Sequence, residues 1–406
     1  MTATTRGLAF GRGFHGLALP AMGVVAMCVA APTVQAGDGG PQINLRTRYE
    51  HVEVDGPLRQ ADALTTQIKL GATRSFWEKW TALFEFEGVY ATGGQNYLSA
   101  PGLLEASNGN SSYPLVPDPS GTDLNRAQIQ WKEGSLDLTL GRQRIIQDNA
   151  RFVGNVGWRQ DEQTFDALRV QYTPTAQISL DYSYVWQQNF IFFNSNRMQT
   201  HLLRLGYTPS SAVALGVFAY AVDFDEDSGR IPGAPDHLTL GLTASGKAKG
   251  LSYRASYASQ SDTADAPSSV DADYLALELA YAIGPIAPTL GYERLSGDGS
   301  YGFQTPFGTN HKFQGFADVF VAATPASGIE DLWVGLSGGI GKAKLGAAYH
   351  QFTPDTGAED LGSEIDLSLA YPLAGGVGLL LKAADYSADS FGSDTQRLWV
   401  QLSYSL

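Results

Sequence analysis

The chain of 406 residues has little of what disulfide-stabilised, metal-binding or catalytic domains are built from. It contains one cysteine, Cys28, and six histidines, and only 17% of its residues are charged. A single thiol cannot close an internal disulfide and gives no zinc ligand set. The histidines at positions 51, 201, 237, 311 and 350 show no spacing typical of a Ser/His/Asp triad or a metal site. The sequence therefore predicts no enzyme, no bound metal and no cofactor.

The chain also has few long apolar runs and no excess of positive charge. Its mean hydropathy is −0.13, which is too low for a helical membrane protein. A β-barrel hides its hydrophobicity, because every second residue faces water. The formal net charge is −14, which makes nucleic acid an unsuitable partner.

The one marked apolar run lies near the N-terminus and is typical of a secretory signal peptide. Arg6 and Arg12 precede the run at Ala21–Ala31, and a small-residue cleavage pattern follows at 34–36. The run is too short to span a bilayer. We therefore expect residues 1–36 to be removed and residues 37–406 to form one domain. Because the removed segment holds two arginines and no acid, the remaining net charge is −16.

The stretch Leu168–Trp186 shows how the rest of the chain is organised. Leu168, Val170 and Tyr172 alternate with polar residues, and after a short turn containing Pro174 the alternation resumes. Successive side chains of a strand point to opposite faces, so this pattern predicts a β-hairpin with one apolar and one polar face.

The same unit recurs, each time with a tyrosine that closes the first strand before a short turn. The repeated tyrosines are Tyr172, Tyr207, Tyr281 and Tyr371. This placement is typical of the aromatic girdle of a transmembrane barrel. A soluble sandwich also explains the alternation, but it does not explain tyrosines at matching positions.

Alternation predicts eighteen strands, connected in turn by short turns and long loops. The predicted strands are 41–54, 63–74, 81–90, 124–132, 136–144, 165–172, 177–187, 199–207, 212–222, 237–245, 251–259, 272–281, 286–295, 329–337, 343–352, 362–371, 376–386 and 395–406. Short turns on one side and long loops on the other match periplasmic and extracellular faces. We expect an all-β, antiparallel, multi-pass transmembrane barrel in the outer membrane of a Gram-negative bacterium, in contact with its lipid and lipopolysaccharide.

The last strand alternates up to Leu406, and a barrel needs such a strand to pair with the first one and remove the open edge. The strand resembles the terminal signal that the barrel-assembly machinery reads, which implies that machinery as a partner.

The phase of the strands predicts which charged residues line the lumen. Eleven inward cations face nine inward acids, which is close to balance. The acids are Glu50, Glu85, Glu87, Asp181, Glu278, Glu293, Asp331, Glu364 and Asp366. The candidate solute-binding residues are the wall cations Arg46, Arg48, Lys69, Arg126, Arg169, Arg204, Arg254 and Arg397, together with Arg142, Arg144, Arg151 and Arg159 from the region 142–159. Arginines in a narrow channel attract and order anions.

Two segments are unusually rich in Arg, Gly and aromatic residues, which suggests loops folded into the pore. The first comprises Asn125-Arg126-Ala127, Gly141-Arg142-Gln143 and Asp148–Ala167, and the second is His311–Trp333. Arg142 and Arg144 share the outward phase of Leu138 and Leu140, which either a bulge at Gly141 or a position above the membrane would explain.

Both segments resemble the signatures of the alginate export family of outer-membrane barrels, with Phe316 where that family often has Trp. The resemblance implies an eighteen-stranded barrel with an arginine-lined pore for an anionic polysaccharide. The expected function is passive, selective passage of a uronate polymer, a uronate oligomer or a small organic anion. The alternative is a diffusion porin for small nutrients.

For the loop Ile145–Thr164 we predict an inward fold that narrows the pore. Arg151 and Arg159 then face the solute together with Arg126, Arg169 and Arg48. Gly154 and Gly157 permit close approach to the wall, and Phe152 and Trp158 serve as apolar anchors. In the alternative, Arg151 and Arg159 pair with Asp148, Asp161 or Glu162 and only stiffen the loop.

Overall fold

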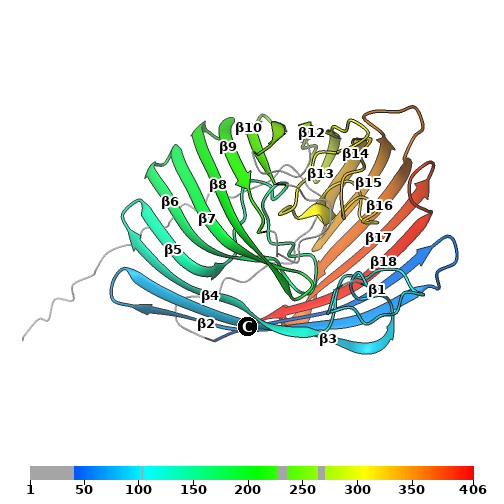
Figure 1. Ribbon diagram of the computed structural model, residues 1–406, viewed down its shortest axis with the longest axis horizontal. Coiled ribbons are helices and arrows are strands. Elements are labelled where there is room, and N and C mark those ends of the chain that lie inside the picture. The colour runs from blue at the N-terminus through cyan, green and yellow to red at the C-terminus, as the bar shows by residue number, and fades with distance from the viewer. Residues whose placement is uncertain (1–40, 103, 226–235, 264–269) are drawn as a thin grey trace, which may run out of the picture.

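The computed structural model describes residues 41–102, 104–225, 236–263 and 270–406. The signal peptide expected at 1–36 and the start at Gly37 lie outside these residues. Eighteen strands run in chain order through the described part (Figure 1): β1 Pro41–Val54, β2 Ala61–Phe76, β3 Trp80–Asn96, β4 Gly121–Glu133, β5 Leu136–Gln143, β6 Thr164–Thr175, β7 Ile178–Phe190, β8 Asn194–Ser210, β9 Val213–Val222, β10 His237–Ala248, β11 Leu251–Asp262, β12 Asp271–Tyr281, β13 Ile286–Leu295, β14 Ile329–Ile340, β15 Ala343–Thr353, β16 Gly362–Pro372, β17 Gly378–Ala388 and β18 Thr395–Ser405.

All eighteen strands belong to one closed antiparallel sheet. Each strand pairs with its neighbours in sequence, and β1 pairs with β18 in a continuous register from Asn44 opposite Ser405 to Val54 opposite Thr395. Two backbone hydrogen bonds between Ile43 and Leu406, of 3.0 and 2.9 Å, complete the seam. Closure leaves no open edge, as predicted from the last strand. The predicted strand number and order are confirmed, with ends that differ by a few residues.

Two short 3-10 turns, η1 Asn310–Lys312 and η2 Ala374–Gly376, are the only helical elements in the described ranges. No helix among the described residues is long and apolar enough to cross a membrane.

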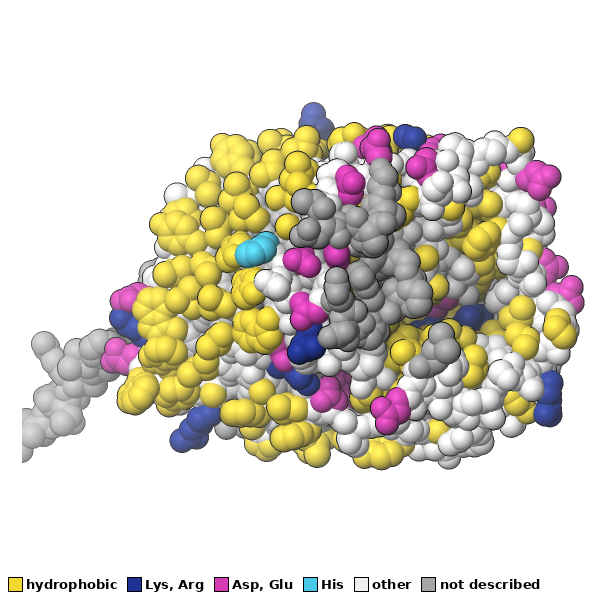
Figure 2. Space-filling model, in the orientation of Figure 1, with side chains coloured by type: hydrophobic (Ala, Val, Ile, Leu, Met, Phe, Trp, Pro, Cys, Tyr) yellow, Lys and Arg dark blue, Asp and Glu magenta, His cyan; other side chains and the backbone are white. Residues whose placement is uncertain are grey.

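The outer wall is apolar and the inner wall is polar, as strand alternation requires. Leu240, Leu277 and Leu367 are about half exposed on the outside, and hydrophobic side chains cover the wall on the left of the view, over β6–β8 (Figure 2). The four repeated tyrosines are exposed on this outer wall beside short turns. On the inside, Glu50, Glu85, Glu87, Glu293, Asp331, Glu364 and Asp366 are buried, which confirms their predicted inward phase.

Gly141 does not carry a bulge, because β5 pairs with both neighbours without a register shift at this residue. Its φ of +111° is instead a conformation that favours glycine, and a Cβ there would overlap the carbonyl oxygen of Ala127. The close approach of β4 explains why glycine stands at this position. Of the two explanations for the phase of Arg142, the bulge is therefore wrong.

Candidate functional site: the inner loops of the barrel

Two loops lie inside the ring of strands and form the candidate site. The first inner loop, residues 144–163, connects β5 to β6, and the second inner loop, residues 296–328, connects β13 to β14. Figure 1 shows both within the barrel, where the second carries the 3-10 turn η1. The inward fold predicted for the first loop is what the structure shows, and the second loop accompanies it.

Backbone contacts join the two loops into one body. The amide of Gly154 donates to the carbonyl of Phe307 at 2.8 Å, and the amide of Thr309 donates to the carbonyl of Ala150 at 2.9 Å. A Cβ on Gly154 would overlap the hydroxyl of Thr309. This glycine therefore permits close approach to the second loop, not to the wall as predicted. The constriction consists of both loops, although the residues in these two hydrogen-bonded pairs lie more than 150 positions apart in sequence.

The first loop is anchored to the wall by Arg46 on β1. The guanidinium donates to Gln160 Oε1 at 2.8 Å, to the carbonyl of Gly157 at 2.8 Å and to the carbonyl of Arg159. The side-chain amide of Gln160 donates in turn to the hydroxyl of Thr65 on β2 at 2.9 Å. Arg46 thus binds loop carbonyl groups, which are acceptors it would need to release before it could hold a solute.

Arg48 lies one position further along the same face and holds the loop by its aromatic residue. Its guanidinium carbon lies 3.9 Å from the ring centroid of Trp158, and it donates to the carbonyl of that residue and to Gln401 Oε1 at 2.7 Å. Arg48 and Arg159 are both near the carboxylate of Asp118, from the loop between β3 and β4. Trp158 is confirmed as an anchor.

Arg159 is the centre of a buried ion-pair network that joins both loops to the wall. It contacts Glu50 on β1 at 3.0 Å and Asp318 of the second loop at 2.6 Å, and Glu50 also pairs with Arg397 on β18 at 3.0 Å. The side chain of Arg159 is only 4% exposed. Burial alone would lower its pKa, but Glu50, Asp318 and Asp118 outweigh that effect and raise it. This guanidinium therefore stays charged, and it holds the two loops against the wall.

Between the two loops, His311 stacks on Trp158 with ring centroids 4.2 Å apart and planes 4° apart. Burial lowers the pKa of His311 well below its usual value, against the opposing effect of Asp318, and Lys382 adds to the lowering. The neutral ring donates from Nδ1 to Asp318 at 2.7 Å and accepts at Nε2 from Lys382 Nζ at 2.6 Å. Lys382 on β17 also lies 3.2 Å from the ring centroid of Phe316. This stack locks the loops together.

The second inner loop is docked on β16 through its backbone. The amide of Phe316 donates to Asp366 at 3.1 Å, and the amide of Ala317 donates to Glu364 at 2.7 Å. Gly315 has a φ of +80°, and a Cβ there would overlap the carboxylate of Glu364. The loop therefore lies against the wall with backbone on side chain, which a larger residue at 315 would prevent.

A second charged cluster lies where the first loop leaves β5. Arg144 contacts Glu162 and, at 3.2 Å, Glu85 on β3, while Arg126 on β4 contacts Glu85 at 2.8 Å. Lys69 on β2 contacts Glu162 at 2.7 Å. Burial would raise the pKa of Glu162, but Arg144 and Lys69 outweigh it and hold that pKa well below its usual value. Arg144, with 30% of its side chain exposed, still reaches water in the lumen.

Arg151 and Phe152 extend the first loop towards β12 and β13. Arg151 contacts Glu293 at 2.8 Å and is 2% exposed, while Phe152 packs against Phe218 and Tyr274 with ring centroids 5.0 Å apart. Phe152 is therefore the second predicted anchor. Neither Arg151 nor Arg159 pairs with Asp148, Asp161 or Glu162, so the predicted alternative is right that these arginines are paired but wrong about their partners.

The remaining candidate cations are spread over the wall and do not gather around Arg151 and Arg159. Arg169 pairs with Asp181, Arg142 pairs with Asp123 at 3.2 Å and Asp166 at 2.8 Å, and Arg204 and Arg254 both contact Asp148. Each of the twelve candidates has a carboxylate or carbonyl partner. The structure thus brings eleven of the predicted residues to the lumen in separate clusters, whereas Arg142 keeps the outward phase of Leu140.

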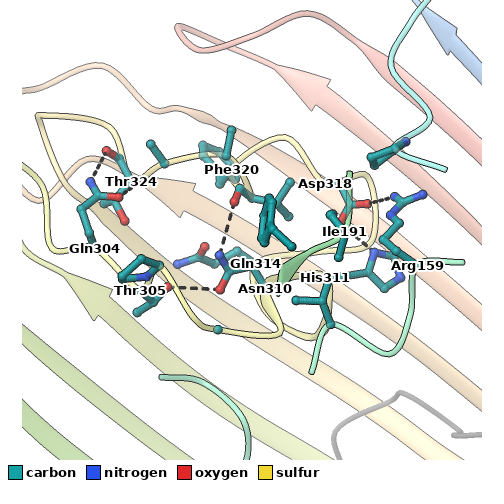
Figure 3. A pocket seen from close by; sticks show the side chains of 18 of the residues that line it. Arg159, Ile191, Gln304, Thr305, Asn310, His311, Gln314, Asp318, Phe320 and Thr324 are labelled. Carbon is teal, nitrogen blue, oxygen red and sulfur yellow. Dashed lines mark hydrogen bonds and ion pairs between the residues drawn. The ribbon is translucent and has the colours of Figure 1, made fainter. Parts of the chain in front are cut away.

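The two inner loops line a cavity of about 170 Å³ (Figure 3). Gln304, Asn310 and Gln314 point into it from the second loop, Arg159 and Asp318 close one end, and Phe320 contributes an apolar surface. Amide side chains offer both donors and acceptors, so the cavity suits polar groups such as hydroxyls and carboxylates.

Sequence reasoning did not assign a role to Asp118, Gln160 or Asp318, which hold the loops, and it placed Lys382 only among the eleven inward cations of the wall. Asp118 lies in a long loop with no periodic pattern. Gln160 and Asp318 lie in the two segments rich in Arg, Gly and aromatic residues, and that composition was the only available signal for them.

The family model for alginate export matches residues 42–337, more than half of the chain. The chain belongs to the alginate export family. It is an outer-membrane β-barrel channel of that family, as the resemblance of its two segments predicted. The matched range includes both inner loops.

Solved structures share the fold at low sequence identity. OccAB4 of Acinetobacter baumannii is 12% identical, with a TM-score of 0.68, over 92% of this chain and 99% of that one. OccK9 of Pseudomonas aeruginosa is 14% identical, with a TM-score of 0.69, over 91% and 98%. The outer membrane protein OpdK of Pseudomonas aeruginosa is 13% identical, with a TM-score of 0.69, over 91% and 98%. No curated protein sequence matches the chain at a significant level.

Proposed function

We propose that this channel gives passive, selective passage to small carboxylate-bearing solutes such as monomeric uronates or other small organic anions. The observation that carries the proposal is a series of guanidinium groups that each pair with a carboxylate and still reach water in the lumen. The side chains of Arg144, Arg204, Arg126 and Arg169 are 30%, 19%, 15% and 14% exposed. Guanidinium groups bind carboxylates in a bidentate manner and keep their charge.

Small solutes fit the lumen better than a continuous polymer does. The two inner loops cross the lumen and are joined to each other by backbone hydrogen bonds, the stack of His311 on Trp158 and the ion pair of Arg159 with Asp318. A polymer would need to pass this joined body for the whole time of its transport. We therefore favour uronate monomers or short oligomers over polymeric alginate.

Diffusion with modest selectivity is the second candidate function. The pairing of every candidate cation with a carboxylate or carbonyl group favours it, because paired charges project a weaker field into the lumen.

Planar-bilayer recording distinguishes the two. We expect a reversal potential in a salt gradient that shows anion preference, and block by glucuronate but not by glucose. Changing Arg126, Arg144 and Arg169 together to Gln should reduce the anion preference and weaken the block several-fold. The matched control is Arg197→Gln, since Arg197 is 65% exposed and 3.8 Å from Asp225. Equal passage of glucuronate and glucose in the unaltered channel would favour the diffusion porin.

A further inference from the structure

The carboxylate of Asp148, in the first inner loop, lies between two arginines of the barrel wall. Oδ1 is 3.4 Å from Arg204 Nη2 on β8, and Oδ2 pairs with Arg254 Nη2 on β11. Asp148 has a φ of +55° in the first inner loop. All three side chains reach water: Asp148 and Arg204 are each 19% exposed, and Arg254 is 11% exposed.

The wall holds the guanidinium of Arg204 in place by contacts that do not involve Asp148. Arg204 Nη2 donates to Thr243 Oγ1 on β10 at 3.0 Å. The guanidinium lies over Gly216 on β9, where a Cβ would be 2.6 Å from Nη2. Glycine at 216 therefore makes room for the Arg204 side chain. The guanidinium can keep this place whether or not a carboxylate is bound to it.

Acids and cations both surround this site. Glu278 on β12 is the register partner of Arg254, Asp181 on β7 is the register partner of Arg204, and Lys312 of the second inner loop lines a neighbouring cavity together with Arg254 and Glu278. If Asp148 moves away, a solute carboxylate of equal charge can take its place, so the net charge of the site does not change.

We propose that Asp148 occupies a carboxylate-binding site formed by Arg204 and Arg254, and that the carboxylate of a passing solute displaces it. The inference rests on the proposed function and names the site at which selection takes place. Displacement exchanges one carboxylate for another of the same charge and geometry, in water-accessible surroundings, so no ion is buried or stripped of its partners. Such a site binds its solute weakly enough to release it, as conduction requires.

The test is the block of single-channel current by glucuronate, with glucose as the uncharged probe. Asp148→Asn removes the competing charge but keeps the size of the side chain, so we expect the half-blocking concentration of glucuronate to fall about three- to ten-fold. Asp148→Glu restores a competing carboxylate and should return the value towards that of the unaltered channel. Arg204→Met combined with Asp148→Asn should lose the gain. Asp225→Asn, which removes a carboxylate near the exposed Arg197, is the matched control and should change nothing.

The outcomes separate this inference from the proposed function. If glucuronate blocks the unaltered channel and blocks the Asp148→Asn channel at the same half-blocking concentration, the proposed displacement of Asp148 is wrong, but the proposed selective channel is not contradicted. If glucuronate and glucose behave alike in every variant, the proposed function itself fails. An equal gain in Asp225→Asn would attribute the effect to overall charge and overturn the specific site. Retained heat-modifiable migration on gels shows that each variant has formed its barrel.

Discussion

Two of the sites at which arginines meet carboxylates in the lumen differ in their access to water. Arg159 lies between Glu50 and Asp318 with 4% of its side chain exposed. Asp148 lies between Arg204 and Arg254 and is about five times as exposed, at 19%. The residue types are the same, but the first site is enclosed by two loops and the second opens to the lumen.

This difference decides what each site can do. A buried charge that loses its partner has no water to replace it, so the partners of Arg159 cannot be exchanged without a large cost. A water-accessible pair has weaker mutual attraction, and a solute can replace one member. The enclosed site therefore holds the loops together, and the open site is available for a solute.

Breaking the enclosed site should have the largest effect. Arg159→Met leaves the buried carboxylates of Glu50 and Asp318 without this partner and should destabilise the barrel by about 3–5 kcal/mol. The temperature at which the heat-modifiable band unfolds on a gel measures this. The control is Arg197→Met, which removes an exposed pair with Asp225 and should cost less than about 1 kcal/mol. Equal shifts for both variants would contradict the contrast between enclosed and open pairs.

Undocking the second inner loop should have an intermediate effect. Gly315→Ala places a Cβ against the carboxylate of Glu364 and should add an overlap cost of about 1–3 kcal/mol to the backbone strain. We expect a larger and noisier single-channel conductance. Gly299→Ala is the matched control in the same loop, because Gly299 also has a positive φ, +90°, but faces open space. Similar conductance changes in both variants would show that strain alone, and not docking on β16, matters.

The smallest effect should be the weakening of the loop lock at acid pH. The locked state holds His311 neutral, since burial lowers its pKa, whereas an unlocked ring has a pKa of about 6.5. The locking free energy is therefore constant above pH 6.5 and falls below it, by about 1.4 kcal/mol per pH unit until the lowered pKa is reached. Burial would raise the pKa of Asp318, but His311 and Arg159 outweigh it and lower that pKa, so Asp318 stays charged through this window.

Current fluctuations recorded at pH 7.5 and pH 5.5 measure this weakening. We expect more frequent openings of larger amplitude at pH 5.5. His311→Phe keeps a ring against Trp158 but cannot take up a proton, so its fluctuations should be the same at both pH values. A pH response in His311→Phe as large as that of the unaltered channel would assign the effect to another group.

The strands of the barrel wall could be predicted from the sequence almost completely. The strands from Leu168 to Tyr172 and from Ile178 to Trp186 follow from a period of two, and each short turn fixes the pairing of its two neighbours. The phase also placed Glu50, Arg204 and Arg254 on the inner face. These properties are local, because they depend on residues within one hairpin, and so the sequence by itself determined an eighteen-stranded barrel with an apolar outside and a charged lumen.

Tertiary structure alone decided which charge meets which. The phase of a strand gives the face of a side chain but not its partner, and Arg151 pairs with Glu293, which lies 142 residues away. The inner loops have no period, and their positions follow from contacts with each other and with strands on several sides of the barrel. Arg159 and Asp148 lie in the same charged segment, and nothing in the sequence shows that Arg159 is enclosed and Asp148 accessible to water. Their different burial, which only the tertiary structure sets, gives them different roles.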